Sequence, residues 1–363
     1  EGNCMSVIIF LLVLGVLIVV HEFGHFIVAK KTGVRVETFS FGFGKKLFSR
    51  KKKDTEYIIS AVPLGGYVKL AGDNLEEFTG KPYEYYSKPV YQRALIIFFG
   101  PLLNYILGLL FFWLIFTVGY PTLTTKVGAV IEGYGAQAAG VKAGDRIVSI
   151  DGSRIAYWDD LQKIIHEKKN AQSAVLVVDR DGASVTIAVP IKAQEMEDVL
   201  GKKKNIGLLG VAASDEIVLV KHGIVKAGVL AVSKTWSLTA MTCEALWRMV
   251  TGKMSLKDSV TGPLGVFYIT SKAASLGIIP LLHLMAVLSI SLAIFNLLPL
   301  PILDGGHLFL LVVEKVRGRG LSKRSEQVLS QVGFSLMIAL AVLVTLNDVV
   351  KLYGDKIARL FIK

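Results

Sequence analysis

A His-Glu-Phe-Gly-His motif near the start of the chain, residues His21 to His25, has the residue types and the spacing of a metal site. Residues four apart lie on one face of a helix, so His21 and His25 can bind one Zn²⁺. Glu22 lies next to them and can take a proton from a water that the metal has acidified. The motif therefore indicates metal-assisted hydrolysis.

This motif lies inside an apolar stretch that runs from Met5 to about Ala29. About 20 residues rising 1.5 Å each cross the hydrocarbon core of a bilayer, so the stretch is long enough to span a membrane. Ionisable side chains at that depth are costly and usually functional, and a lipid-facing helix would leave them without partners. A short HExxH match can arise by chance, but this setting favours a zinc site within a membrane span.

The composition indicates membrane spans that alternate with soluble parts, since 52% of the residues are hydrophobic and the mean hydropathy is +0.54. The net charge of +12 does not indicate nucleic-acid binding, because the basic residues gather beside apolar segments. They are Lys30, Lys31, Arg35, Lys45, Lys46, Arg50, Lys51, Lys52 and Lys53, and then Arg317, Arg319, Lys323 and Arg324. The positive-inside rule predicts that both groups are cytoplasmic. Cys4 and Cys243 are far apart and indicate neither a disulfide framework nor a cysteine zinc site.

Four segments are predicted to cross the membrane: 6–29, 94–119, 278–298 and 329–347. Pro101 and Asn104 in the second segment would destabilise a lipid-facing helix, so they are expected to bend it or to face protein. The predicted fold class is a multi-span α-helical membrane protein with a membrane-associated β-hairpin and one inserted α/β domain. The expected domains are 1–120 (first half of the membrane core), 121–193 (inserted domain), 194–277 (linker and amphipathic helix) and 278–363 (second half of the core).

The loop between the first two spans contains the predicted β-hairpin. Tyr57–Val62 and Tyr67–Leu70 have the composition of short strands, and Pro63-Leu64-Gly65-Gly66 interrupts them. An exposed strand edge favours aggregation, whereas an edge covered by the spans could pair with an extended peptide by strand addition. A purely structural hairpin is the alternative.

Residues 121–193 are predicted to form a small soluble domain. The expected elements are strands at Val127–Ile131 and Arg146–Ile150, a helix at Trp158–Glu167, and a hairpin of Ala174–Asp179 and Ser184–Pro190 around Asp181-Gly182. Gly133 to Gly152, which ends in Ala-Gly-Val-Lys-Ala-Gly-Asp-Arg-Ile-Val-Ser-Ile-Asp-Gly, resembles the bacterial type of PDZ domain, with Gly135 where a proline is usual. The resemblance implies binding of chain ends or gating of substrates, and a passive spacer is the alternative.

Residues 227–250 are apolar but contain Lys234, Glu244 and Arg248. Apolar and polar side chains fall on different faces of a helix there. A further span would move the segment after residue 298 to the side of the membrane opposite His21. We therefore expect an interfacial amphipathic helix on the outer surface.

A catalytic zinc usually has three protein ligands and one open position, so one ligand remains to be found. The segment Asn296 to His307 offers both Asp304 and His307. Two prolines interrupt the helix before Asp304, and two glycines after it allow close backbone packing. A broken helix at membrane depth requires protein or a cavity around it. The residue types alone leave both ligands open.

At this point the chain resembles the site-2 protease family, especially its bacterial RseP-type branch, in a form with one PDZ domain. The matching elements, in the order of the family, are His21–His25, Gly42-Phe43-Gly44, Pro63–Lys69, Gly100–Asn104, the PDZ-like segment and Asn296–Gly306. The resemblance implies that His21, His25 and Asp304 bind zinc and that Glu22 is the catalytic base. His307 then becomes a neighbour of the site.

The same resemblance implies a role for further residues in substrate binding. Asn296 and Pro299 would help to seat the substrate strand. The membrane-re-entrant hairpin would contribute Pro63, Leu64, Gly65, Gly66 and Tyr67.

The resemblance implies an intramembrane zinc metalloprotease of the bacterial inner membrane, with its zinc site near the cytoplasmic side and its PDZ-like domain outside. Its partners would be membrane lipid and single-span membrane proteins, such as an anti-sigma factor or remnant signal peptides. A non-catalytic membrane protein that holds single-span partners through its PDZ-like domain is the main alternative, but such a protein would be expected to have lost a ligand or Glu22. A zinc or proton transporter would need polar residues along several spans.

Overall fold

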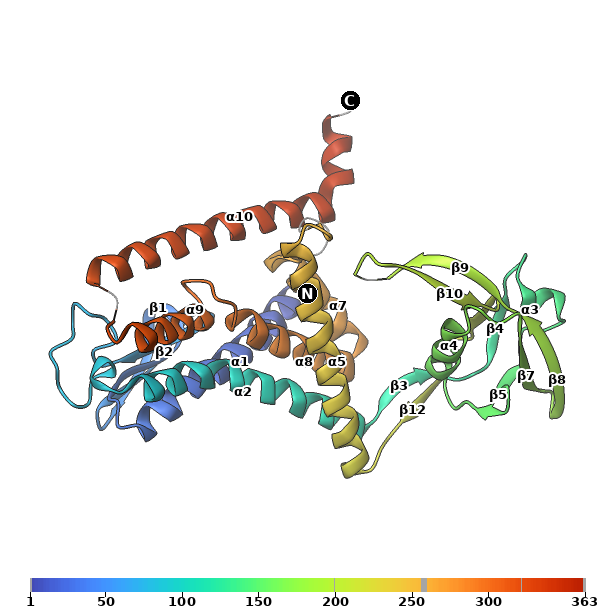
Figure 1. Cartoon of the computed structure of the whole chain (residues 1–363), viewed down its shortest axis with the longest axis horizontal. Coiled ribbons are helices and arrows are strands. Elements are labelled where there is room, and N and C mark those ends of the chain that lie inside the picture. The colour runs from blue at the N-terminus through green and yellow to red at the C-terminus, as the bar shows by residue number, and fades with distance from the viewer. Residues whose placement is uncertain (1, 199, 256–259, 321, 362–363) are drawn as a thin grey trace. The chain divides into compact units, whose positions relative to one another are not determined.

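The computed structural model describes residues 2–198, 200–255, 260–320 and 322–361. The chain divides into two compact units. The first, which we call the membrane core, comprises residues 1–115, 227–250 and 255–363, and the second, which we call the inserted domain, comprises residues 116–226 and 251–254. Each unit is described by itself (Figure 1).

Four helices of the membrane core are long and apolar enough to cross a membrane. They are α1 (Gly2–Lys31), α2 (Val90–Val118), α8 (Ile278–Asn296) and α10 (Lys323–Phe361). Their apolar segments are Cys4–Lys31, Val90–Val118, Ile278–Asn296 and Gln327–Lys351. The prediction of four spans is confirmed within the described residues.

Three further helices belong wholly or mainly to the core, namely α5 (Ile224–Val250), α7 (Pro263–Leu276) and α9 (Asp304–Arg317), and a short 3₁₀ helix, η1, spans Tyr85–Ser87. The predicted amphipathic helix corresponds to α5, which is not among the four span candidates. Val225, Trp236 and Trp247 are highly exposed on α5, as an interfacial helix requires, but its position in a membrane stays a prediction. The sequence reading did not include α7 or α9.

Small residues allow the core helices to approach one another closely. A side chain at Gly24 of α1 would overlap the backbone of α2 at Phe99 and Gly100. A side chain at Gly108 of α2 would meet Ile290 of α8. Asn104 of α2 is fully buried, and the Ser289 hydroxyl of α8 donates to its backbone carbonyl at 2.7 Å. The expectation that the polar residue of the second span faces protein is confirmed for Asn104.

The sheet of the core consists of β1 (Val36–Lys52) and β2 (Thr55–Leu70), which pair antiparallel. The two strands expected at 57–62 and 67–70 are both part of β2, and the prediction that they pair directly is wrong. Phe39 of β1 pairs with Val68 and also with Tyr57, so a segment of β1 lies between them. Gly42 and Gly44 have positive φ, which lets β1 bend. This strand was not predicted from the sequence because a run of basic residues follows these glycines.

The inserted domain contains strands, two helices and a buried apolar core. Its elements are β3 (Tyr120–Leu123), β4 (Val127–Val130), α3 (Gly135–Ala138), β5 (Arg146–Ile150), β6 (Ser153–Arg154), α4 (Trp158–Glu167), β7 (Ser173–Arg180), β8 (Ala183–Pro190), β9 (Lys192–Glu197), β10 (Lys203–Leu208), β11 (Val211–Ala213) and β12 (Ile217–Val220). A four-stranded sheet has the order β6-β5-β7-β8. The predicted strands, helix and hairpin are present, and Asp181 and Gly182 have the positive φ values of a two-residue turn.

The inserted domain extends beyond residue 193, where the sequence reading ended it. β11 pairs with β4 and β12 pairs with β3, so the chain returns to the start of the domain. Leu209 belongs to its core cluster. The segment 194–226 was expected to be a linker. Its described residues, 194–198 and 200–226, are instead part of the inserted domain. Such short strands have little sequence signal because long-range pairing, rather than local pattern, determines them.

Candidate metal centre and active site

Three side chains meet at the candidate metal centre: His21 and His25 of α1 and Asp304, the first residue of α9. One ligand atom from each lies within 4.8 Å of the others. The two Nε2 atoms are 3.2 Å apart, and Asp304 Oδ2 lies 3.2 Å from His21 Nε2 and 3.7 Å from His25 Nε2. In the described part of the chain this is the group of side chains that could hold a metal ion, and His307 is not a member of it.

This cluster fits a zinc ion. Ligand atoms 2.0–2.1 Å from a tetrahedral metal lie roughly 3.3 Å from one another, close to the separations found here. Asp304 Oδ2 is buried and has no hydrogen-bond partner among the described residues. A buried carboxylate oxygen without a hydrogen bond is costly, and a cation would stabilise it. Two imidazoles and one carboxylate are a donor set that zinc accepts.

The backbone of α2 orients one imidazole. His25 donates a hydrogen bond from Nδ1 to the carbonyl oxygen of Ile96 at 2.8 Å. A carbonyl can only accept, so the proton is on Nδ1 and the lone pair of Nε2 faces the cluster. The amide nitrogen Nδ2 of Asn104, also on α2, lies 3.4 Å from Nδ1 of His21. The sequence reading missed Ile96 because any residue can supply a backbone carbonyl.

A glycine of α2 provides the space that the imidazoles occupy. A Cβ atom at Gly100 would overlap the ring of His25 and would lie 3.0 Å from the ring of His21. Gly24, inside the motif, faces the same stretch of α2. The resemblance singled out the segment Gly100–Asn104. In the structure, Gly100 leaves space for the imidazole rings, and Asn104 lies next to the ring of His21.

Glu22 lies between the cluster and the sheet. The Val68 backbone N–H of β2 lies near its carboxylate, and a side chain at Gly66 would lie 3.5 Å from its Cγ. Residues 67–70 pair with β1 on one side only in the register of the sheet, so this segment is an edge. The candidate base therefore lies beside backbone groups that an extended peptide could pair with.

The segment before Asp304 turns sharply and packs against the glycines that follow. Leu303 accepts from Gly306, and side chains at Gly305 or Gly306 would overlap the backbone of Leu297–Pro301. The two prolines and two glycines thus form the compact loop that the sequence indicated. This loop carries the third candidate ligand to the two histidines.

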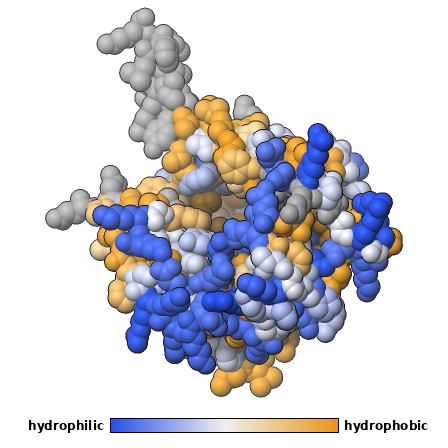
Figure 2. Space-filling view, turned by 90° about the vertical axis from the view of Figure 1, so that its left-hand side faces the viewer, coloured by the Kyte–Doolittle hydropathy of each residue, from blue (hydrophilic) through white to orange (hydrophobic). Residues whose placement is uncertain are grey.

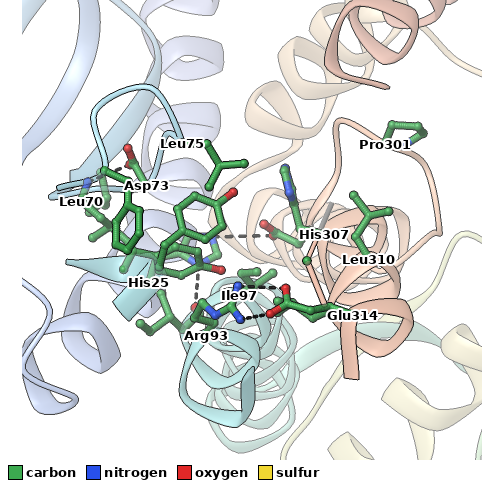
Figure 3. Close-up of a pocket in the computed structure, with 18 of the residues that line it drawn as sticks. His25, Leu70, Asp73, Leu75, Arg93, Ile97, Pro301, His307, Leu310 and Glu314 are labelled. Carbon is green, nitrogen blue, oxygen red and sulfur yellow. Dashed lines mark hydrogen bonds and ion pairs between the residues drawn. The ribbon is translucent and has the colours of Figure 1, made fainter. Parts of the chain in front are cut away.

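A pocket of about 500 Å³ adjoins the cluster. Its lining includes Glu22, His25 and Asp304 at the cluster, together with Asp73 and His307 (Figure 3). Burial raises the pKa of the Asp73 carboxyl above its ordinary value. The pocket gives the cluster a space in which water or substrate can lie.

An ion pair forms part of the pocket wall. The Arg93 guanidinium of α2 donates to both carboxylate oxygens of Glu314 of α9 (Figure 3). Arg93 is buried, and its Nε donates to the carbonyl of Lys88. Neither residue was singled out from the sequence, since 221 positions separate them.

The expected substrate-binding residues lie in two places. Asn296 ends α8, and Pro299 is exposed in the loop that leads to Asp304. In β2, Gly66 lies beside Glu22, whereas the Tyr67 ring stacks on Phe43, 6.1 Å between centroids. Of the remaining hairpin residues, Pro63 is half-buried, Gly65 is buried, and the side chain of Leu64 lies outside the described residues.

Comparison with known proteins identifies the family. The model of Peptidase family M50 matches residues 9–340. A protein from Clostridium acetobutylicum, named provisionally as a zinc metalloprotease, is 34% identical, covering 95% of this chain and 97% of that protein. A protein of the same kind of name from Rhizobium meliloti is 32% identical, covering 95% and 96%. The regulator of sigma-E protease RseP from Escherichia coli is 29% identical, covering 93% and 97%.

One of the matching solved structures covers a smaller part of the chain. The PDZ domain of an SdrC-like protein from Listeria innocua has a TM-score of 0.21 and 21% identity, covering 26% of this chain and 96% of that chain. The family match covers most of the chain, and the names of the relatives support a metalloprotease. The chain belongs to peptidase family M50, the site-2 protease family.

Proposed function

We propose that the protein is an intramembrane zinc metalloprotease that hydrolyses a peptide bond within the membrane segment of single-span membrane proteins. The observation that carries this proposal is the meeting of His21, His25 and Asp304 beside Glu22. Two of these ligands lie in a span candidate, and the third directly follows the loop after another. Zinc, the cofactor named for the relatives, is the proposed metal.

Each residue of the site has a proposed role in the reaction. Zinc bound there supplies Lewis-acid chemistry, which polarises the scissile carbonyl and acidifies water. Glu22 takes the proton of the attacking water and delivers it to the nitrogen of the leaving amine. The Ile96 carbonyl keeps the Nδ1 proton of His25 in place, so that Nε2 presents its lone pair.

The edge of β2 is the proposed binding site for the substrate backbone. A helical substrate hides its amides, and its unwound segment must find hydrogen bonds in a medium without water. Residues 66–70 have a strand partner on one side only, and Gly66 lies beside Glu22, so strand addition at the other side would bring a peptide bond to the base. Asn296 and Pro299 are proposed to seat the same strand from the loop before Asp304.

The inserted domain is proposed to bind peptide ends and so to control which substrates are cut. A groove of about 140 Å³ lies between α4 and the segment 207–211, and it is lined by Leu161, Ile165, Ile131 and Gly210 among others. An apolar groove between a helix and a strand suits an extended peptide. Anti-sigma factors trimmed on the outer side and remnant signal peptides are the proposed substrates.

The distribution of charge supports an inner-membrane protein whose metal centre faces the cytoplasm. Exposed basic residues lie in the second half of β1, among them Lys45 and Arg50, and Lys53 directly follows it. Hydrophilic side chains cover much of the face of the core in Figure 2. Basic loops stay on the cytoplasmic side. The inserted domain would then lie outside.

The position of the cut bond tests the proposal. Purified full-length protein in detergent would be incubated with a single-span reporter, and the products would be weighed by mass spectrometry. We expect a cut inside the apolar segment that a zinc chelator prevents. A cut only in the flanking soluble residues would contradict intramembrane cleavage, and binding of the reporter without any cut would favour the membrane binding protein.

A further inference from the structure

The N-terminus of α9 carries one ligand of the proposed metal centre, but α9 itself is weakly embedded. Gly305, Gly306 and Leu311 are its buried residues, whereas Phe309, Val312 and Val316 are more than half exposed. The loop before Asp304 fixes the start of α9 through its own backbone contacts. Those contacts do not determine how far Asp304 stands from the histidines of α1.

The Arg93–Glu314 ion pair supplies that connection. Both oxygens of Glu314 accept from the guanidinium, one of them at 3.1 Å, so the contact is bidentate and directional. Glu314 lies about 15 Å along the helix from Asp304, at ten residues of 1.5 Å each. A helix is stiff over this length, so holding one end defines the position of the other.

Arg93 is itself firmly held. Its Nε donates to the carbonyl of Lys88 at 3.1 Å, and its guanidinium lies 6.0 and 5.6 Å from the ring centres of Tyr85 and Tyr86. One turn later on α2, the Ile96 carbonyl accepts from His25. The same segment of α2 thus contacts the histidine side of the cluster and the helix that carries Asp304.

We propose that the Arg93–Glu314 ion pair is a positioning device that sets the distance between Asp304 and the two histidines, and thereby the affinity of the site for zinc. This inference rests on the proposed metal centre and adds a control element to it. The pair lies outside the ligand set, so it acts through α9. Loss of residues that orient metal ligands typically lowers metal affinity roughly 10- to 100-fold.

A double-mutant cycle tests the proposal in the full-length protein. Zinc affinity would be measured by competition with a chelating indicator for wild type, R93Q, E314Q and R93Q/E314Q. Each single variant leaves one charge without its partner, either the buried Arg93 or the half-buried Glu314, whereas the double variant removes both charges and keeps two amides in place. The control is K46Q/E56Q, which removes an ion pair of 2.8 Å that is far more exposed, in the same unit.

We expect each single variant to bind zinc roughly 10- to 100-fold more weakly. The double variant should lose no more zinc affinity than the single variant that binds zinc more weakly, because each single substitution already breaks the same ion pair. The control should bind like wild type. Unchanged zinc affinity in all three variants, even with a lower unfolding temperature, would overturn the proposal. The proposal would also be overturned if the losses of zinc affinity in the two single variants added up in the double variant. If wild type and H21A bound zinc equally, the metal centre itself would be refuted, and the positioning device with it.

Discussion

The Nδ1 atom of His25 donates to the carbonyl oxygen of Ile96 across the interface of α1 and α2, at 2.8 Å. This contact fixes the tautomer of His25 by geometry alone, because the acceptor cannot donate. His21 has a different neighbour, the amide of Asn104, at 3.4 Å. An amide can turn either its oxygen or its nitrogen toward a ring. The nitrogen faces the ring in this structure. With the amide turned over, its oxygen would accept the Nδ1 proton, and Nε2 of His21 would also present its lone pair to the cluster.

This arrangement predicts that N104L weakens zinc binding roughly 10- to 100-fold, because the ring of His21 loses its orienting partner. Leucine keeps the branched arrangement of four heavy atoms of the asparagine side chain, so it fills the same position without an amide. Zinc affinity of the purified protein is the measurement. S289A removes a contact to the backbone of Asn104 only, and it should bind zinc like wild type. Equal affinities for N104L and wild type would mean that the amide has no part in orienting the ligand.

Gly100 is expected to tolerate no side chain. G100A places a methyl group where the rings of His25 and His21 lie, so the rings must move and zinc content at a limiting free zinc concentration should fall at least about tenfold. Metal analysis of the purified variant gives the result. G223A is a suitable control, since nothing lies within 4 Å of a Cβ atom at that position. Full zinc occupancy of G100A under these conditions would show that the helices can separate at no cost.

The groove of the inserted domain gives a prediction that is separate from the metal. I131E adds a charge and bulk to one wall of the groove, and it should abolish the binding of labelled peptides that end in a free carboxylate. Fluorescence anisotropy with the full-length protein measures this. I217E changes an exposed residue outside the groove lining and should bind peptide normally. Zinc affinity should be unchanged in both variants. Normal peptide binding by I131E would remove the groove from the proposal.

The inserted domain should lose stability in acid. Two hydrogen bonds from the Arg180 guanidinium hold the pKa of the Asp145 carboxyl below its ordinary value. The carboxylate therefore contributes stability above its unfolded pKa near 3.9, and this contribution is lost as the pH falls through the lower folded pKa. The protection of the backbone around Asp145 against hydrogen exchange, corrected for the intrinsic exchange rate at each pH, should fall below about pH 4.

D145N tests the same contact at neutral pH. It removes the charge from the pair, so we expect a loss of roughly 1.5–3 kcal/mol and a flatter dependence of exchange on acid. The control is D181N, since Asp181 is exposed and asparagine accepts its left-handed conformation. Equal acid sensitivity of D145N and wild type would assign the acid dependence to other carboxylates.

The sequence alone predicted the parts of the fold that local pattern determines. The spans follow from runs of apolar residues, and the helix over Trp158–Glu167 and the turn at Asp181-Gly182 follow from periodicity and turn chemistry. Local pattern could not predict β11 and β12, whose partners lie at the far end of the domain. It also could not predict that a segment of β1 lies between the two parts of β2.

The candidate site shows the same division. His21 and His25 are four residues apart, and this spacing on a helix predicted their shared face, with Glu22 next to them. Asp304 and His307 could not be separated by residue type, and the structure brings Asp304 to the histidines. Arg93 and Ile96 remained hidden because a distant ion pair and a backbone carbonyl have no sequence pattern. Asn104 could be identified from the sequence as a polar residue in a span, but its position next to His21 could not be predicted.

The most direct test of the account compares wild type with E22Q on one purified single-span reporter, with the zinc content of both proteins measured in the same preparation. We expect both proteins to bind zinc, because Glu22 is not a proposed ligand, and we expect E22Q to cleave about 10²- to 10⁴-fold more slowly than wild type. Cleavage by zinc-loaded E22Q at a rate near that of wild type would contradict the assignment of Glu22 as the base and, with it, the central claim.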